Sequence, residues 1–180
     1  QQSILHVRAF DLDVIGQLPN ANRPALIGKP GEQVQAVRFA GDRAYVVTFR
    51  RIDPLYVLDL ADPVDPLQAG ELEVTGFSDH LYPLANGLLL GVGREADAQG
   101  MTQAVKLALF DVANPAQPAV LATELYGGPM ASTALDSSPH GIAFLDTGNN
   151  VVRVALPMVL GSSAFAPPDP STRALQRLEV

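Results

Sequence analysis

Short apolar runs alternate with turn-forming residues along the whole chain, and two of these units share one pattern. Segment 55–66 reads LYVLDLADPVDP, and segment 107–118 reads LALFDVANPAQP. Each unit is an apolar strand followed by a turn. In that turn, Asp62 or Asn114 can accept a hydrogen bond from the backbone two residues on, and the prolines prevent the strand from continuing. The pattern predicts two equivalent strand–turn units.

Further strands are expected around both units. They cover 34–39, 44–49 and 70–74 around the first unit, and 80–84, 88–93 and 122–126 around the second. Asn86-Gly87 indicates a hairpin, because both residues tolerate positive φ. The result is a group of four antiparallel strands that recurs after 52 residues, the spacing from Asp59 to Asp111. A period of about 50 residues is typical of propeller blades of the kelch or WD type.

The predicted fold is therefore all-β, a partial β-propeller of four-stranded antiparallel blades forming one fragment over 1–180. It comprises the outer strands of a preceding blade (1–29), two blades (30–78 and 79–128), and a partial blade (129–180) with a Pro-rich loop at 161–172. This makes about three to three and a half blades, whereas closed propellers have at least about four. We expect part of a larger ring, whose exposed sheet edges could pair copies into a homo-oligomer. A β-sandwich is the alternative, but it does not explain the repeat.

Composition narrows the classes of partner. Hydrophobic residues make up 47% of the chain and charged residues 17%, which is the balance of a folded protein. The net charge of −7 argues against nucleic acid as a partner. The chain has no cysteine, which excludes thiol chemistry and disulfides, and no apolar run of membrane-spanning length. Because it begins at Gln1, we expect a processed or cloned N-terminus.

Several consecutive strands and turns resemble a known family. Segments 31–50 and 53–60, with 76–78 and 105–112, are similar to secreted bacterial and archaeal proteins that carry a C-terminal β-propeller domain. The resemblance implies a secreted, periplasmic or cell-envelope propeller of no assigned activity, and it supplies no catalytic residue. The family has an Asp-His pair where this chain has Pro139-His140, so no role passes to His140.

In a propeller, the loops on one face are the usual ligand surface. We expect no catalytic residue and no metal ligand there, but we expect that face to gather these candidates for ligand contact: Arg50, Arg51, Asp53, Ser78, Asp79, His80, Arg94, Glu95, Asp97 and His140, with Ser137 and Ser138 nearby.

Three chemical alternatives use the same residues. His80 and His140 begin adjacent predicted innermost strands and could share a metal, although two histidines alone make a poor zinc site and each could instead bond a neighbouring loop. Glu95 and Asp97 supply only two of the several oxygen ligands that calcium needs. We therefore expect no cofactor, and a bound calcium ion is the less favoured alternative. A triad of Asp136, Ser137 and His140 is rejected, because neighbours on one strand cannot face one another.

The sequence favours a non-enzymatic binding or scaffold module of an extracytoplasmic protein, with a protein or glycan at the cell envelope as its partner. The alternative is a metal-dependent propeller hydrolase or lactonase whose site is completed by residues outside this chain. A purely structural role, packing against the rest of its own protein, is the third hypothesis. Binding is favoured over catalysis because the predicted innermost strands are largely apolar, with Val34, Ala36, Leu81, Ile142 and Phe144.

Overall fold

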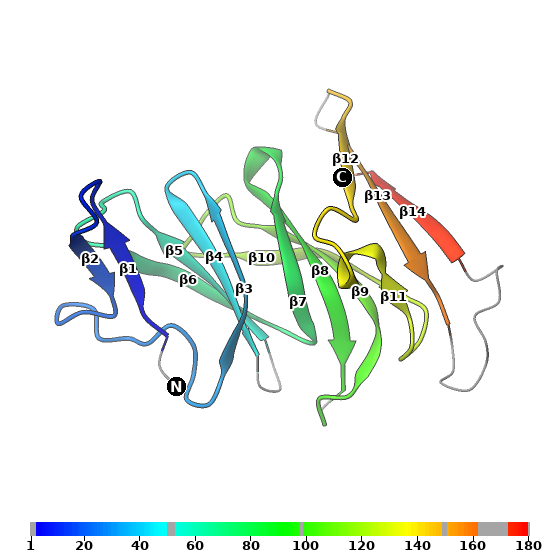
Figure 1. The fold of residues 1–180 in the computed structure, drawn as a ribbon, viewed down its shortest axis with the longest axis horizontal. Coiled ribbons are helices and arrows are strands. Elements are labelled where there is room, and N and C mark those ends of the chain that lie inside the picture. The colour runs from blue at the N-terminus through cyan, green and yellow to red at the C-terminus, as the bar shows by residue number, and fades with distance from the viewer. Residues whose placement is uncertain (1–2, 50–52, 98, 149–150, 162–172, 180) are drawn as a thin grey trace.

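The computed structural model describes residues 3–49, 53–97, 99–148, 151–161 and 173–179, which form four antiparallel sheets side by side in chain order (Figure 1). An outer pair consists of β1 (Leu5–Arg8) and β2 (Val14–Leu18). Blade A consists of β3 (Gln33–Ala40), β4 (Arg43–Phe49), β5 (Asp53–Asp59) and β6 (Leu67–Val74). Blade B consists of β7 (Phe77–Pro83), β8 (Leu88–Ala96), β9 (Thr102–Asp111) and β10 (Ala119–Tyr126). Blade C consists of β11 (Ser132–Thr133), β12 (Ala143–Asp146), β13 (Val152–Val159) and β14 (Arg173–Glu179).

The two repeated segments lie in equivalent places, which confirms the predicted all-β propeller architecture. Residues 55–59 lie on β5 and residues 107–111 on β9, each the third strand of a separate four-stranded sheet. The predicted turn chemistry is also present. The Asp62 carboxylate accepts a hydrogen bond from the Val64 N–H at 3.1 Å, and the Asn114 side chain accepts one from the Ala116 N–H at 3.2 Å.

A contact between each turn and the preceding sheet joins neighbouring blades. The turn of blade A packs on Gly16 of β2, and the turn of blade B packs on Gly70 of β6. A Cβ atom at either glycine would lie less than 3.0 Å from a backbone carbonyl, that of Pro63 or of Pro115. We call this the glycine–turn contact. Only a residue without a side chain allows so close an approach.

Among the described residues, the hydrophobic core forms three clusters between successive sheets. Alternate residues of one strand serve different clusters: Val46 packs toward the outer pair with Leu18, whereas Val47 packs toward blade B with Leu81 and Phe110. A third cluster, between blades B and C, includes residues from β8, β9 and β13. Because both faces of the middle strands are buried, these strands are continuously apolar rather than alternating.

The innermost strands differ in extent from the prediction. β7 begins at Phe77, three residues before the predicted start at His80, because a bulge at Asp79 lets the pairing with β8 continue. In the last blade, the sequence predicts an inner strand at 141–145, and the structure has β12 there; a separate short strand, β11, precedes it, and both pair with β13. Between them, a capping box of Thr133 and Asp136 begins a short 3-10 helix, η2 (Ala134–Asp136), that takes the chain out of the sheet.

The turn predicted at Asn86-Gly87 and the last part of blade C complete the fold. A second 3-10 turn, η1 (Ala85–Gly87), occupies the Asn86-Gly87 position, and both residues have the positive φ expected of the hairpin. Blade C ends with β14, which pairs with β13. The Pro-rich loop predicted at 161–172 lies outside the described residues except for Gly161. Among the described residues, no helix has the length and apolar character needed to cross a membrane.

Candidate functional site

Three innermost strands place chemically different side chains at one level of the structure. Arg38 of β3, Tyr82 of β7 and Phe144 of β12 occupy equivalent positions. Each pairs with the residue two places after the start of the next strand: Tyr45, Leu90 and Val154. These three pairing partners are all buried. We call Arg38, Tyr82 and Phe144 the inner row.

The rings of the inner row touch one another and continue along β7. The ring centroids of Tyr82 and Phe144 are 5.0 Å apart with a tilt of 48°, a favourable aromatic arrangement. His80 lies on the same side of β7, with its ring 6.4 Å from that of Tyr82 and nearly parallel to it. Tyr82 packs against the core between blades B and C, whereas Phe144 remains 39% exposed. The rings are therefore held in place and still open to solvent.

The positive charge of Arg38 lies close enough to Tyr82 to affect the pKa of its phenol. Burial raises the pKa of the Tyr82 phenol, and the positive charge of Arg38 acts in the opposite direction. The Arg38 guanidinium forms no ion pair or side-chain hydrogen bond within the described part of the chain. Its charge is therefore available to a bound group.

A polar pair borders the inner row on the same two strands. β3 and β7 each contain a bulge at the equivalent position, Gln35 and Asp79 respectively. Bulges redirect a side chain that would otherwise follow the pleat. Here the two bulged residues face each other, and Gln35 Nε2 donates a hydrogen bond to Asp79 Oδ1 at 2.6 Å.

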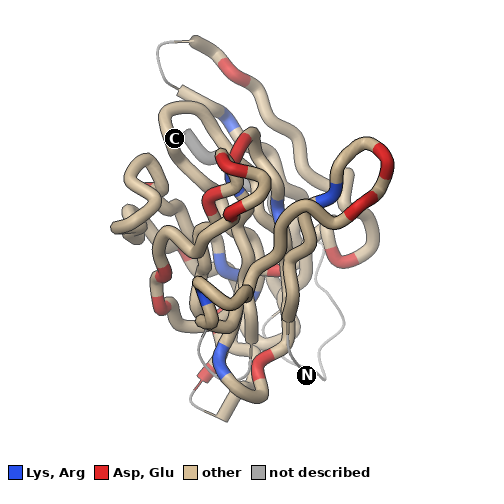
Figure 2. The backbone as a smooth tube through the Cα atoms, turned by 90° about the vertical axis from the view of Figure 1, so that its left-hand side faces the viewer, with Lys and Arg blue, Asp and Glu red and all other residues tan. Residues whose placement is uncertain are grey.

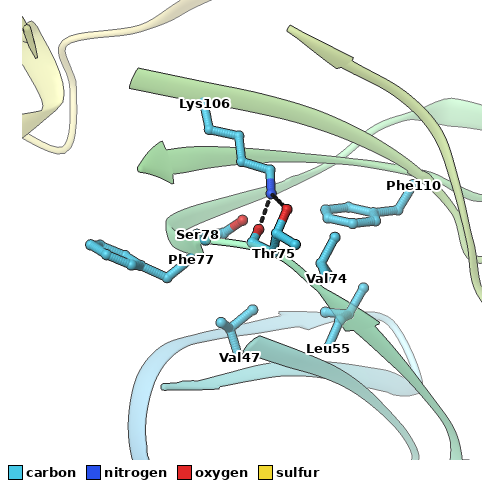
Figure 3. Close-up of a pocket in the computed structure, with 9 residues that line it drawn as sticks. Val47, Leu55, Val74, Thr75, Phe77, Ser78, Lys106 and Phe110 are labelled. Carbon is cyan, nitrogen blue, oxygen red and sulfur yellow. Dashed lines mark hydrogen bonds between the residues drawn. The ribbon is translucent and has the colours of Figure 1, made fainter. Parts of the chain in front are cut away.

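A second polar group lies in a small pocket between blades A and B (Figure 3). Lys106 is only 4% exposed; its Nζ donates to the Thr75 carbonyl and lies 3.0 Å from Glu95 Oε2. The other walls are mostly apolar and include Phe77 and Phe110, with Ser78 among them. The space has room for about a water molecule. Lys106 thus ties the crossover between the blades to β8. Of the two candidates for ligand contact near this pocket, Ser78 is buried and Glu95 is partly buried in the ion pair with Lys106.

Arg94 connects blades B and C. Its guanidinium donates to the Ala131 carbonyl, and its Nη2 lies 2.6 Å from Asp136 Oδ2. The same Asp136 carboxylate accepts the Thr133 N–H of the capping box at 3.0 Å. Arg94 and Asp136, both considered at the sequence level, therefore meet across a blade boundary.

The other predicted residues are dispersed. Asp97 Oδ1 accepts hydrogen bonds from the N–H groups of Gln99 and Met101, so this carboxylate stabilises its own turn. His140 lies in the exposed loop before β12, not at a strand start, and its N–H donates to Ser138 Oγ at 3.3 Å. Ser137 Oγ donates to the Ala134 carbonyl. Arg50 and Arg51 lie outside the described residues, as does the side chain of Asp53.

The acidic residues do not gather into a metal site in the part of the chain that the structure describes. No group of three or more His, Cys, Asp or Glu side chains there could hold a metal ion. Figure 2 shows the acidic residues spread over several loops. The candidates thus divide among the inner row with its polar pair, the Lys106 pocket and the boundary between blades B and C.

Sequence reasoning missed Gln35, Arg38, Tyr82, Phe144 and Lys106 as site residues. The 52-residue repeat contained no signal for the inner row, because Arg38 and Tyr82 lie 44 residues apart and are matched by strand pairing in the structure rather than by the repeat spacing. The matched position holds two chemically unlike residues, which a purely structural repeat does not require. Lys106 had a weak signal as the single charge within the apolar run at 104–110.

Comparison with known proteins agrees with this architecture. The family model described as "Beta propeller domain" matches residues 1–172. The chain belongs to the beta propeller domain family. No solved structure matches this propeller chain.

Two archaeal relatives of the propeller are both described as uncharacterized proteins. One, from Archaeoglobus fulgidus, is 39% identical over 152 residues, which is 81% of this chain and 22% of the relative. The other, from Methanocaldococcus jannaschii, is 36% identical over 114 residues, which is 63% of this chain and 16% of the relative. The match thus spans about a fifth of the length of these relatives.

Proposed function

We infer that this propeller chain is a non-enzymatic binding module of an extracytoplasmic protein, with the inner row as its ligand surface. The observation that carries this inference is the contact of Tyr82 with Phe144 beside Arg38, whose guanidinium has no ion-pair partner among the described residues. Three adjacent blades place a cation and two rings at one level, where packing alone would be satisfied by aliphatic residues. Aromatic and Arg side chains are the groups that dominate binding surfaces.

The acidic residues support binding over the alternative of a metal-dependent hydrolase. Glu95 is paired with Lys106, and Asp97 stabilises its own turn. Asp79 is bonded to Gln35 and Asp136 to Arg94, so these carboxylates have protein partners. The extracytoplasmic placement rests on the resemblance of segments 31–50 and 53–60 to secreted proteins.

Co-sedimentation with cell-envelope fractions tests the proposal. We expect the purified intact protein to sediment with envelopes of its source cells, and the double variant Tyr82→Ala/Phe144→Ala to remain largely in the supernatant. The matched control is Phe39→Ala, which removes an exposed ring from β3 outside the inner row. Equal sedimentation of the double variant and the wild type would contradict the proposal, provided both show the same circular dichroism.

A further inference from the structure

We propose that the inner row binds an extended acidic glycan, one whose sugar rings carry carboxylate groups. This inference rests on the proposed function and names the ligand class for the same surface. It follows from three features of the row: partly exposed aromatic rings, a cation without an ion-pair partner among the described residues, and the flanking polar pair of Gln35 and Asp79.

The aromatic part of the row suits a ligand made of successive rings. His80, Tyr82 and Phe144 form a path of rings with centroid separations of 6.4 and 5.0 Å. Phe144, at one end of this path, is 39% exposed, and the small pocket lies elsewhere, at Lys106. An open path of rings offers little to a compact small molecule, but it offers repeated flat contacts to a chain of sugars, whose C–H faces are apolar. Such contacts also cost little entropy, because aromatic side chains have few rotatable bonds.

The charge of the row selects an anionic ligand. The chain as a whole is acidic, with a net charge of −7, so its average field repels anions. Arg38 opposes that field locally, and within the described residues its guanidinium has no carboxylate partner. Guanidinium groups recognise carboxylates through two parallel hydrogen bonds. A carboxylate on the sugar bound beside Tyr82 would therefore meet Arg38.

The flanking polar pair suits sugar hydroxyl groups. Asp79 lies three residues before Tyr82, which is roughly 10 Å along a strand and about the length of two sugar units. The bond from Gln35 fixes Asp79 Oδ1 and leaves Oδ2 with acceptor capacity. A neutral hydroxyl can donate to this carboxylate, whereas a second carboxylate would be repelled. The surface therefore has an anion-binding end and a hydroxyl-binding end.

Calorimetric titration of the intact protein with defined probes tests this assignment. The probes are an oligomer of a uronic acid, the methyl ester of the same oligomer, and polyglutamate of similar length, which has charge without rings. We expect the uronic acid oligomer to bind about tenfold more tightly than its ester, as a charge-assisted hydrogen bond predicts. We expect polyglutamate to bind at least tenfold more weakly than the acid oligomer.

Three variants assign the effects to residues. Arg38→Gln should make the acid and its ester bind equally, and Phe144→Leu should weaken both about tenfold while keeping an apolar side chain. The control Phe39→Leu should change neither affinity. Equal binding of acid and ester by the wild type would overturn the acidic part of the proposal. Tight binding of polyglutamate that Phe144→Leu leaves unchanged would overturn the glycan part.

The two proposals fail in distinguishable ways. If neither oligomer binds, but envelope sedimentation still depends on Tyr82 and Phe144, the inner row is a binding surface for another ligand class and only the glycan inference is wrong. If the sedimentation is also independent of these rings, the proposed function is wrong as well.

Discussion

The boundary between blades A and B and the boundary between blades B and C are built from the same repeat with different chemistry. Phe49 of blade A and Arg94 of blade B occupy equivalent positions, because each pairs with the first residue of the innermost strand in its own sheet. Phe49 contacts Phe77 of the next blade, with ring centroids 4.8 Å apart. Arg94 instead forms an ion pair with Asp136 of its next blade. At this one position, the boundary between blades A and B has an aromatic contact and the boundary between blades B and C has an ion pair.

The outer ends of the two boundaries also differ, in how closely a neighbouring turn can approach the outer strand. Gly70 of β6 receives the turn of blade B, whereas the equivalent residue of β10 is Ala122. A Cβ at Gly70 would clash with the Pro115 carbonyl, so a turn cannot approach Ala122 as closely. β10 also remains open, with Leu121 and Leu125 exposed by 54% and 52%. The repeat thus specifies the blade, while single residues decide how closely neighbouring blades approach.

The largest expected effect comes from closing the space at the glycine–turn contact. Gly70→Ala should destabilise the intact protein by about 1–3 kcal/mol, because the new Cβ meets backbone that cannot move aside as a flexible side chain can. Chemical denaturation measures the change. The reverse exchange, Ala122→Gly, is the matched control and should cost no more than about 1 kcal/mol, the entropic penalty of glycine. Similar losses for both variants would show that the two outer ends are equivalent.

A smaller effect is expected at the charged boundary. A double-mutant cycle with Arg94→Gln and Asp136→Asn should give a coupling energy of about 0.5–1 kcal/mol, because Asp136 is partly exposed and water screens the pair. The coupling should shrink as salt is added. The cycle is needed because Asp136 also accepts the Thr133 N–H, so Asp136→Asn alone changes the capping box. A coupling energy of zero at low salt would show that the ion pair between Arg94 and Asp136 does not stabilise this boundary.

The comparison also separates what local sequence determines from what it does not. The third strands and their turns could be predicted, because Asp62 and Asn114 act on backbone only two residues away. The bulges at Gln35 and Asp79 could not, because a bulge depends on the register of the partner strand. Similarly, Glu95 reads as a loop carboxylate until Lys106, eleven positions along the chain, is brought against it. Local chemistry determines the blade, whereas much of the candidate site depends on contacts between strands and sheets.

The smallest expected effect lies at the first boundary, between the outer pair and blade A, and it depends on pH. Arg23 bridges this boundary to Asp65 through two hydrogen bonds of 2.9 and 2.5 Å, and the bond from Arg23 holds the pKa of Asp65 below its ordinary value of 3.8. A carboxyl whose pKa is lower in the folded state stabilises the protein above its unfolded pKa, and it loses that contribution as the pH falls through the folded pKa. The stability difference between wild type and Asp65→Asn should therefore be present at pH 6 and decline below about pH 4.

Chemical denaturation at several pH values measures this difference, and Asp62→Asn is the matched control because its carboxylate caps the same turn without contacting Arg23. Both side chains of the Arg23–Asp65 pair are more than a third exposed, so solvent screening keeps the effect small. A difference for Asp65→Asn that stays constant from pH 6 to pH 2 would mean that the side chain acts through its shape in the turn. In that case, the charge of Asp65 would contribute nothing to the boundary between the outer pair and blade A.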